Sequence, residues 1–166
     1  AQVNAKAKEI FDAIYTTVNK HSNRASIATK PDDVYRLKKE GKRAIYIGVE
    51  NGYPIGDDLS QVKLFYDMGA RYITLCHTRN NQICDSSTDP DGPRHNGLSQ
   101  FGREVVAEMN RLGMIVDVSH ASRKTCLQAV QERKAYCVAF PPVVCSDDNR
   151  RRCYKIFRPG GTDAYT

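Results

Sequence analysis

Three residues whose side chains can bind a metal or move a proton stand at the ends of three different apolar segments. They are Glu50, His77 and His120. A carboxylate and neutral imidazoles form a ligand set that suits zinc, a borderline-soft divalent cation. Two such ions ~3.5–4 Å apart can share a water, lower its pKa and polarise a carbonyl. The residue types therefore indicate hydrolytic metal chemistry.

Each of these residues alone has a simpler interpretation, because a histidine after a strand often caps a helix and a glutamate is often solvated. Their equivalent positions in successive units favour a shared site. The two other histidines, His21 and His95, lie at a helix end and in a long polar loop, and we expect both at the surface.

The elements that position these residues repeat along the chain. Apolar runs predict strands, and apolar residues at helical spacing predict the helices between them. This alternation predicts an α/β fold with a parallel sheet, either open or closed into a barrel. The predicted strands are 43–50, 71–77, 114–120 and 135–140, and the predicted helices are 3–22, 32–40, 59–68, 100–112 and 122–133.

Local signals place the ends of these helices. Ser99 and Ser122 are predicted N-caps, and Gly113 is a predicted C-cap. Thr29 is the predicted N-cap of the helix 32–40, with Pro31 in its first turn. In parallel α/β folds, active sites lie at the carboxyl ends of the strands. Glu50, His77 and His120 stand at these ends.

Missing motifs, the charge pattern and the length of the apolar runs argue against several other functions. The sequence has no phosphate-binding loop, dinucleotide fingerprint or Gly-x-Ser-x-Gly elbow. The net charge of +6 would permit nucleic-acid binding. However, the charges mostly alternate along helical faces, so we expect no nucleic-acid partner. No apolar run approaches the ~20 residues of a transmembrane segment. The six cysteines form no CxxC pair and leave the cellular compartment open.

Four long motifs resemble the membrane (renal) dipeptidase family over about residues 1–135. They are GVENG at 48–52, TLCHTRNN at 74–81, GLSQFGREVV at 97–106 and MNRLGMIVDVSH at 109–120. The resemblance implies a (β/α)8 TIM barrel and a zinc peptidase that hydrolyses dipeptides, including those with a C-terminal D-residue. This chain would supply about four consecutive βα units of that barrel.

The resemblance also implies roles for individual residues. Glu50 resembles the carboxylate that bridges two zinc ions, and His120 resembles a zinc ligand. His77 resembles the catalytic histidine that binds the substrate and stabilises the tetrahedral oxyanion. The implied mechanism is the attack of a metal-bridging hydroxide on the peptide carbonyl. We expect Asp117 and Ser119, which flank His120 in the predicted strand 114–120, to have supporting or structural roles.

The sequence departs from the family pattern in two ways. It has no His-x-Asp pair on an early strand, and Pro141 stands where a second zinc-binding histidine is expected. After Lys134 the motifs end abruptly. We therefore expect a partial barrel domain over 1–140 and an irregular tail over 141–166, which a frameshift would explain.

These departures leave two hypotheses for the function. The chain is a fragment of a zinc dipeptidase with a dipeptide substrate, or it is an inactive truncated remnant. The remnant would bind metal weakly or associate with another chain. An incomplete barrel exposes strand edges, so we also expect self-association. At 166 residues, the chain falls short of the ~250 that such a barrel needs.

Overall fold

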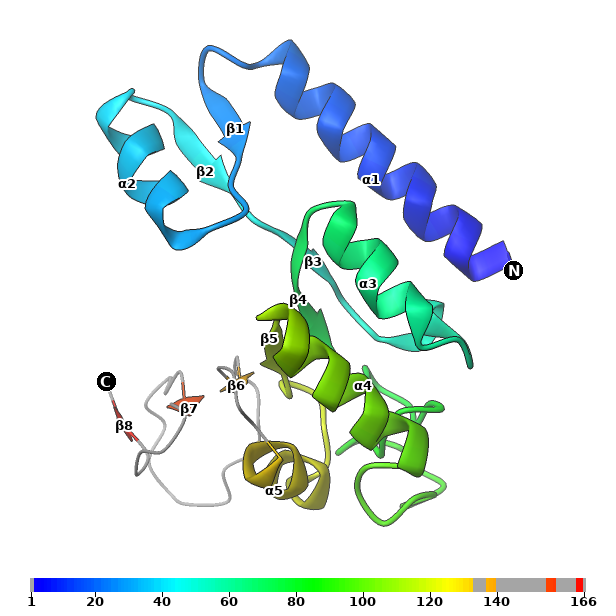
Figure 1. Cartoon of the computed structure of the whole chain (residues 1–166). Coiled ribbons are helices and arrows are strands. Elements are labelled where there is room, and N and C mark those ends of the chain that lie inside the picture. Colours follow the sequence, from blue (N-terminus) through cyan, green and yellow to red (C-terminus); the bar gives the residue numbers. More distant parts are fainter. Residues whose placement is uncertain (1, 133–136, 140–154, 158–163, 166) are drawn as a thin grey trace.

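Parallel strands and helices alternate through most of the molecule (Figure 1). The computed structural model describes residues 2–132, 137–139, 155–157 and 164–165. Six strands form one sheet in the order β3-β4-β5-β6-β7-β8, and the pairs from β3 to β6 are parallel. The prediction of an α/β fold with a parallel sheet is confirmed for these four strands. They are β3 Ile47–Val49, β4 Ala70–Thr74, β5 Ile115–Asp117 and β6 Cys137–Ala139.

Three helices follow β3, β4 and β5 in turn: α3 Ser60–Asp67, α4 Gln100–Leu112 and α5 Arg123–Gln131. The Ser99 side chain accepts a hydrogen bond from Gly102 N, and the Ser122 side chain accepts one from Thr125 N. Gly113 ends α4 with a left-handed φ of 73°. Both predicted serine N-caps and the predicted glycine C-cap are confirmed.

The predicted strand 43–50 is divided in two. Its first part is β2 Arg43–Ile45, which pairs in parallel with β1 Ala25–Ile27 in a separate two-stranded sheet. Its second part is β3, which joins the large sheet, and Tyr46 separates the two. We did not predict β1, because its three residues are too short to show an apolar pattern.

The predicted capping of the second helix is wrong in one detail. This helix is α2 Pro31–Lys39, and its N-cap is Lys30 rather than Thr29. The Asp33 carboxylate, inside the first turn, accepts hydrogen bonds from the backbone N–H of Thr29 at 2.9 Å and of Lys30 at 3.1 Å. The Asp33 carboxylate, at the third position of the helix, thus reaches back to the backbone N–H of the N-cap, as the acidic residue of a capping box does.

The C-terminal segment also differs from the expectation. Two short strands, β7 Lys155–Phe157 and β8 Ala164–Tyr165, lie in the segment 141–166 that we expected to be irregular. They continue the sheet beyond β6 with antiparallel pairing, which requires no crossover helix. Pro141 lies outside the described residues.

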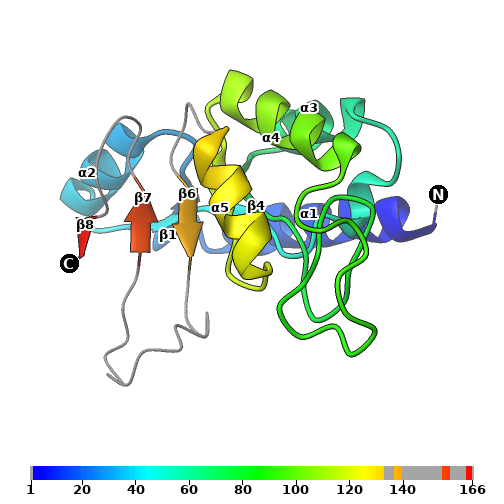
Figure 2. The same cartoon turned by 90° about the horizontal axis from the view of Figure 1, so that it is seen from below.

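The core lies between the large sheet and the helices. Figure 2 shows α3 and α4 side by side over the sheet, and their buried side chains pack against those of β4 and β5. The N-terminal helix α1 Gln2–Lys20 adds Phe11, whose ring stacks on that of Phe65 with centroids 5.9 Å apart. The long loop after β4 lies at the end of the sheet toward which β6 points.

Close approach between α4 and this loop gives a first prediction. A Cβ built on the buried Gly102 would lie 2.0 Å from the carbonyl oxygen of Ile83, which also accepts a hydrogen bond from Ser99 N. We expect Gly102→Ala to lower the free energy of unfolding by ~1–3 kcal/mol or more, because neither backbone can move away freely. Urea denaturation measures this change. Glu104→Ala, at an exposed position of α4, is the control, and equal losses in both variants would contradict the prediction.

Candidate metal centre

The strand order places the three candidate residues at one edge of the sheet. Strands β3, β4 and β5 are parallel neighbours, so their carboxyl ends lie together. Glu50 follows the last residue of β3 directly, whereas His77 and His120 each come three residues after the end of their strands.

The side chains of Glu50, His77 and His120 converge. Glu50 Oε1 lies 3.6 Å from His77 Nε2 and 3.6 Å from His120 Nε2. The two imidazole rings have their centroids 4.2 Å apart and are tilted by 46°. One ligand atom from each residue lies within 4.8 Å of the others, and among the described residues this is the one group of its kind.

The accessibility of the group suits a reacting centre. The side chains of Glu50, His77 and His120 are 68%, 42% and 25% exposed. A ligand can therefore approach from the solvent side, while His120 is the most firmly enclosed of the three. One carboxylate and two imidazoles are donors that zinc accepts, and atoms this close can reach one ion at its usual ~2.0–2.2 Å with small side-chain adjustments.

A buried carboxylate supports the strand ends beneath the site. Asp117, 3% exposed, accepts a hydrogen bond from Thr74 Oγ1 at 2.6 Å, which joins the last residues of β5 and β4. It also accepts hydrogen bonds from the backbone and side chain of Ser119. These contacts fix the chain just before His120 and fit the supporting role that we expected for Asp117 and Ser119.

The loop between β4 and α4 is held by a second buried carboxylate, Asp85. Its oxygens accept hydrogen bonds at 2.8 Å from the backbone N–H groups of Arg94, His95 and Gly97. Burial alone would raise the pKa of Asp85. The three backbone donors outweigh that effect and hold the pKa below its ordinary value.

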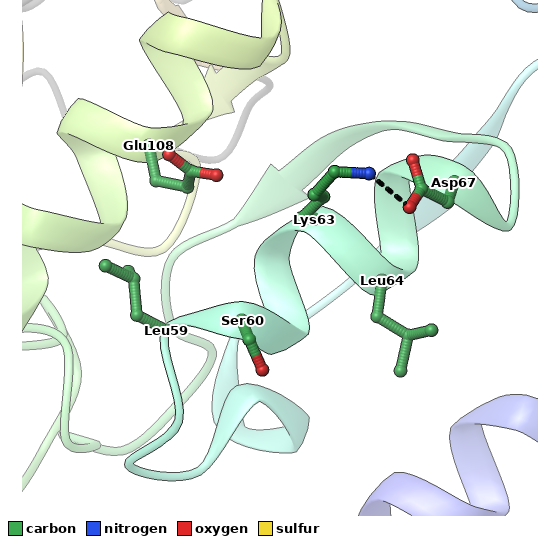
Figure 3. Close-up of a pocket in the computed structure, with 6 residues that line it drawn as sticks. All are labelled: Leu59, Ser60, Lys63, Leu64, Asp67 and Glu108. Carbon is green, nitrogen blue, oxygen red and sulfur yellow. Dashed lines mark hydrogen bonds and ion pairs between the residues drawn. The ribbon is translucent and has the colours of Figure 1, made fainter.

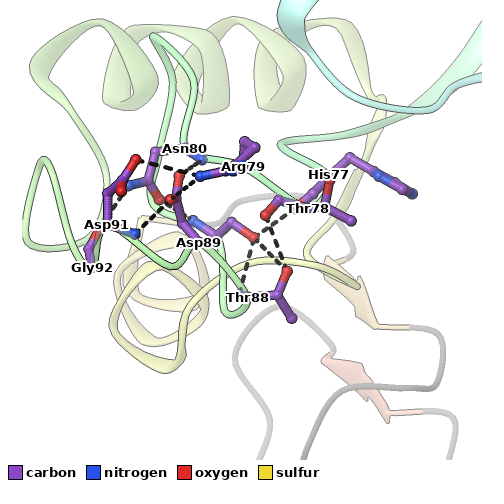
Figure 4. A network of polar contacts seen from close by, with 9 residues as sticks. His77, Thr78, Arg79, Asn80, Thr88, Asp89, Asp91 and Gly92 are labelled. Carbon is purple, nitrogen blue, oxygen red and sulfur yellow. Dashed lines mark hydrogen bonds and ion pairs between the residues drawn. The ribbon is translucent and has the colours of Figure 1, made fainter.

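A third carboxylate, that of Asp89, organises the tip of the loop (Figure 4). It accepts a hydrogen bond from the backbone of Asn80 at 2.7 Å and forms an ion pair with Arg79 at 3.2 Å. In Figure 4 the ring of His77 points away from this network, so its imidazole is left to face Glu50 and His120.

Two asparagines near Glu50 were not singled out from the sequence. Asn51 has a left-handed φ of 71°, and its Oδ1 accepts a hydrogen bond from Asn81 Nδ2 at 3.0 Å. Asn81 Nδ2 also donates to the carbonyl of Leu75, just after β4, at 2.8 Å. The signal available in the sequence was Asn51-Gly52 directly after a strand, because asparagine tolerates the left-handed region.

The remaining histidines lie outside the group. His95 Nε2 contacts the carbonyl oxygen of Asn81 at 2.8 Å, within the loop. His21 is exposed in the turn after α1. Neither shares the cluster that Glu50, His77 and His120 form.

A separate shallow pocket lies between α3 and α4 (Figure 3). Its volume is about 410 Å³, and an ion pair between Lys63 and Asp67 at 2.6 Å runs along one side. None of the three candidate residues lines it, so we do not assign it to the reaction. Its lining consists of Leu59, Ser60, Lys63, Leu64, Asp67 and Glu108.

Within the described part of the chain, no helix has both the length and the apolar character needed to cross a bilayer.

Comparison with known proteins identifies the family. The family model of the membrane dipeptidases, peptidase family M19, matches residues 2–159. The chain is 40% identical over 136 residues to dipeptidase tcpJ of Claviceps purpurea, which covers 82% of this chain and 30% of that protein. It is 41% identical over 115 residues to dipeptidase verJ of Clonostachys rogersoniana, covering 69% of this chain and 29% of that one.

A solved structure agrees with these relatives. The chain superposes on the probable dipeptidase PvdM from Pseudomonas aeruginosa with a TM-score of 0.75 and 36% identity, over 78% of this chain and 34% of that one. The chain thus spans about a third or less of the length of each of these proteins. On the extent of the family match and the identity to these relatives, the chain belongs to the membrane dipeptidase family.

Proposed function

We propose that this chain carries part of the active site of a zinc-dependent dipeptidase. The observation that carries the proposal is the convergence of Glu50, His77 and His120 at the carboxyl edge of the sheet, in a chain of the membrane dipeptidase family. The dipeptidases tcpJ and verJ support a dipeptide as the substrate.

The three side chains divide the chemistry by type. Glu50 and His120 would hold the metal, because a carboxylate and a neutral imidazole are zinc ligands. When bound, zinc supplies a water of lowered pKa and polarises the scissile carbonyl. His77 is the more exposed of the two histidines. It would bind the dipeptide and donate a hydrogen bond to the oxygen of the scissile carbonyl, on which negative charge develops.

The architecture that we propose around this site is a partial (β/α)8 barrel. Residues 1–140 would form this domain, and the strands β7 and β8 of the segment 141–166 extend its sheet with antiparallel pairs. The parallel order β3-β4-β5-β6, with helices α3, α4 and α5 between the strands, supports the barrel. Among the described residues, strand β3 pairs with a single neighbour in the large sheet, so its other edge is where self-association would occur.

A second candidate is an inactive remnant that binds metal weakly. The exposure of Glu50 and the presence of only three ligand residues in the described cluster favour it. An incomplete set of ligands binds a metal more weakly than a full set, because each coordinate bond contributes to the binding free energy.

Zinc titration combined with a dipeptide assay separates the two candidates. We expect the intact chain to bind zinc in a calorimetric titration and to hydrolyse L-Ala-D-Ala after zinc is added. A chelator should abolish the turnover, because it removes the ion held by Glu50 and His120. Zinc binding without turnover, or no binding at all, would favour the remnant.

A further inference from the structure

The hydroxyl of Ser86 lies between the peptide groups of the two site histidines. Ser86 Oγ donates a hydrogen bond to the carbonyl oxygen of His77 at 2.6 Å and lies 3.3 Å from the carbonyl oxygen of His120. Ser86 is 8% exposed, so water does not readily replace these contacts. One buried hydroxyl thus joins residues that are 43 positions apart in the sequence.

The next residue strengthens the contact with His120. Ser87 N donates to the carbonyl oxygen of His120 at 2.9 Å, and Ser87 Oγ lies 3.2 Å from the same atom. The carbonyl of His120 therefore keeps a backbone hydrogen bond whichever side chain stands at position 87. Among the described residues, the hydrogen-bond donor to the carbonyl oxygen of His77 is Ser86 Oγ.

Ser86 is itself held in place. Its backbone N–H donates to Asn80 Oδ1 at 2.8 Å, and it forms an isolated antiparallel bridge with Ala121. The backbone that carries the hydroxyl is therefore held in place, so the hydroxyl can fix the positions of the groups that it contacts. Moving the carbonyl of His77 would move the ring attached to the same residue.

We propose that Ser86 is a positioning residue that sets the separation of the His77 and His120 imidazoles. Its hydroxyl holds the end of β4 against the end of β5 after the strand pairing has stopped at Thr74 and Asp117. Metal and transition-state binding require side chains to be placed within ~0.5 Å, so such a brace would matter for the site more than for the fold. The consequence for zinc rests on the proposed function; the effect on the two rings does not.

Three variants test this role. Ser86→Ala removes the hydroxyl, Ser86→Thr restores one, and Ser87→Ala is the matched control that keeps the backbone bond to His120. We expect Ser86→Ala to shift the ring resonances of His77 and His120 in NMR spectra of the metal-free protein and to weaken zinc binding by ~10–100-fold in calorimetric titration. Ser86→Thr should restore both toward wild type, and Ser87→Ala should leave both close to wild type.

One further measurement and the threonine variant keep the result interpretable. Thermal unfolding of each metal-free variant shows whether the fold survives, and Ser86→Thr covers the case in which Ser86→Ala is poorly folded. If the wild-type chain binds no zinc, the proposed function fails, but the histidine resonances still decide the positioning role. Unchanged ring resonances in a folded Ser86→Ala variant, or no rescue by a folded Ser86→Thr variant, would overturn the proposal.

Discussion

Glu50→Gln is expected to lower zinc affinity by at least about 100-fold and to stop zinc-dependent dipeptide hydrolysis. The loss should exceed the ~10–100-fold typical of residues that only support a ligand, because Glu50 is itself a proposed ligand. The glutamine keeps the shape of the side chain but carries no charge and binds zinc poorly. Glu50 Oε1 lies 3.6 Å from both imidazole nitrogens, so the charge is lost at the centre of the group.

Two controls accompany this variant. Glu104→Gln makes the same chemical change on an exposed position of α4 and should leave zinc affinity unchanged. Thermal unfolding of metal-free Glu50→Gln should match wild type, because Glu50 is largely exposed. Competition with a chromophoric chelator measures the affinities. Wild-type affinity in Glu50→Gln would exclude Glu50 as a ligand.

Asp85→Ala should cause a large loss of stability. The carboxylate is fully buried and accepts hydrogen bonds from three backbone N–H groups. A hydrogen bond to a charged group contributes ~1.5–3 kcal/mol, and the buried donor of Gly97 would be left without its partner, so we expect the free energy of unfolding to fall by ~3 kcal/mol or more. Urea denaturation measures the change. A loss close to that of an exposed control such as Glu104→Ala would contradict this account of the loop.

The same carboxylate predicts a pH dependence of stability. The pKa of Asp85 is lower in the folded protein than its ordinary value, so its stabilising contribution is complete above the ordinary carboxyl range. That contribution is lost as the pH falls through the folded pKa. Asp85→Asn cannot titrate, and it should lose less stability than wild type when urea denaturation is compared between neutral and acidic pH.

Local chemistry explains why much of the fold could be predicted. Ser99, Ser122 and Gly113 fix the ends of α4 and the start of α5 through hydrogen bonds and backbone angles within a few residues. The convergence of Glu50, His77 and His120 followed from a rule of topology, since parallel strands bring their carboxyl ends to one edge. Short-range signals and this rule together were sufficient to predict that these three side chains converge.

Long-range contacts explain what could not be predicted. The strand 43–50 is interrupted near Tyr46, whose hydroxyl donates to the carbonyl of Lys30 at 2.7 Å. A Cβ on Gly48 would lie 1.9 Å from the Tyr72 ring, which explains the glycine but depends on a residue of the next strand. The contacts of Ser86 and Asn81 likewise join segments that are far apart in the sequence, and no local sequence pattern predicts them.

The dependence of the loop on two strands has a consequence for the order of folding. The Asp85 carbonyl accepts hydrogen bonds from Ser122 N at 2.8 Å and Thr125 Oγ1 at 3.1 Å, both beyond β5. Ser86 contacts His120 in the same region. These bonds can form only after β4 and β5 have paired, and pairing strands so distant in sequence is slow because of loop-closure entropy. We therefore expect the contacts between the loop and the segment after β5 to form late. The amide hydrogen of Ser122, which donates to the Asp85 carbonyl, should become protected from solvent exchange only when β4 and β5 have paired.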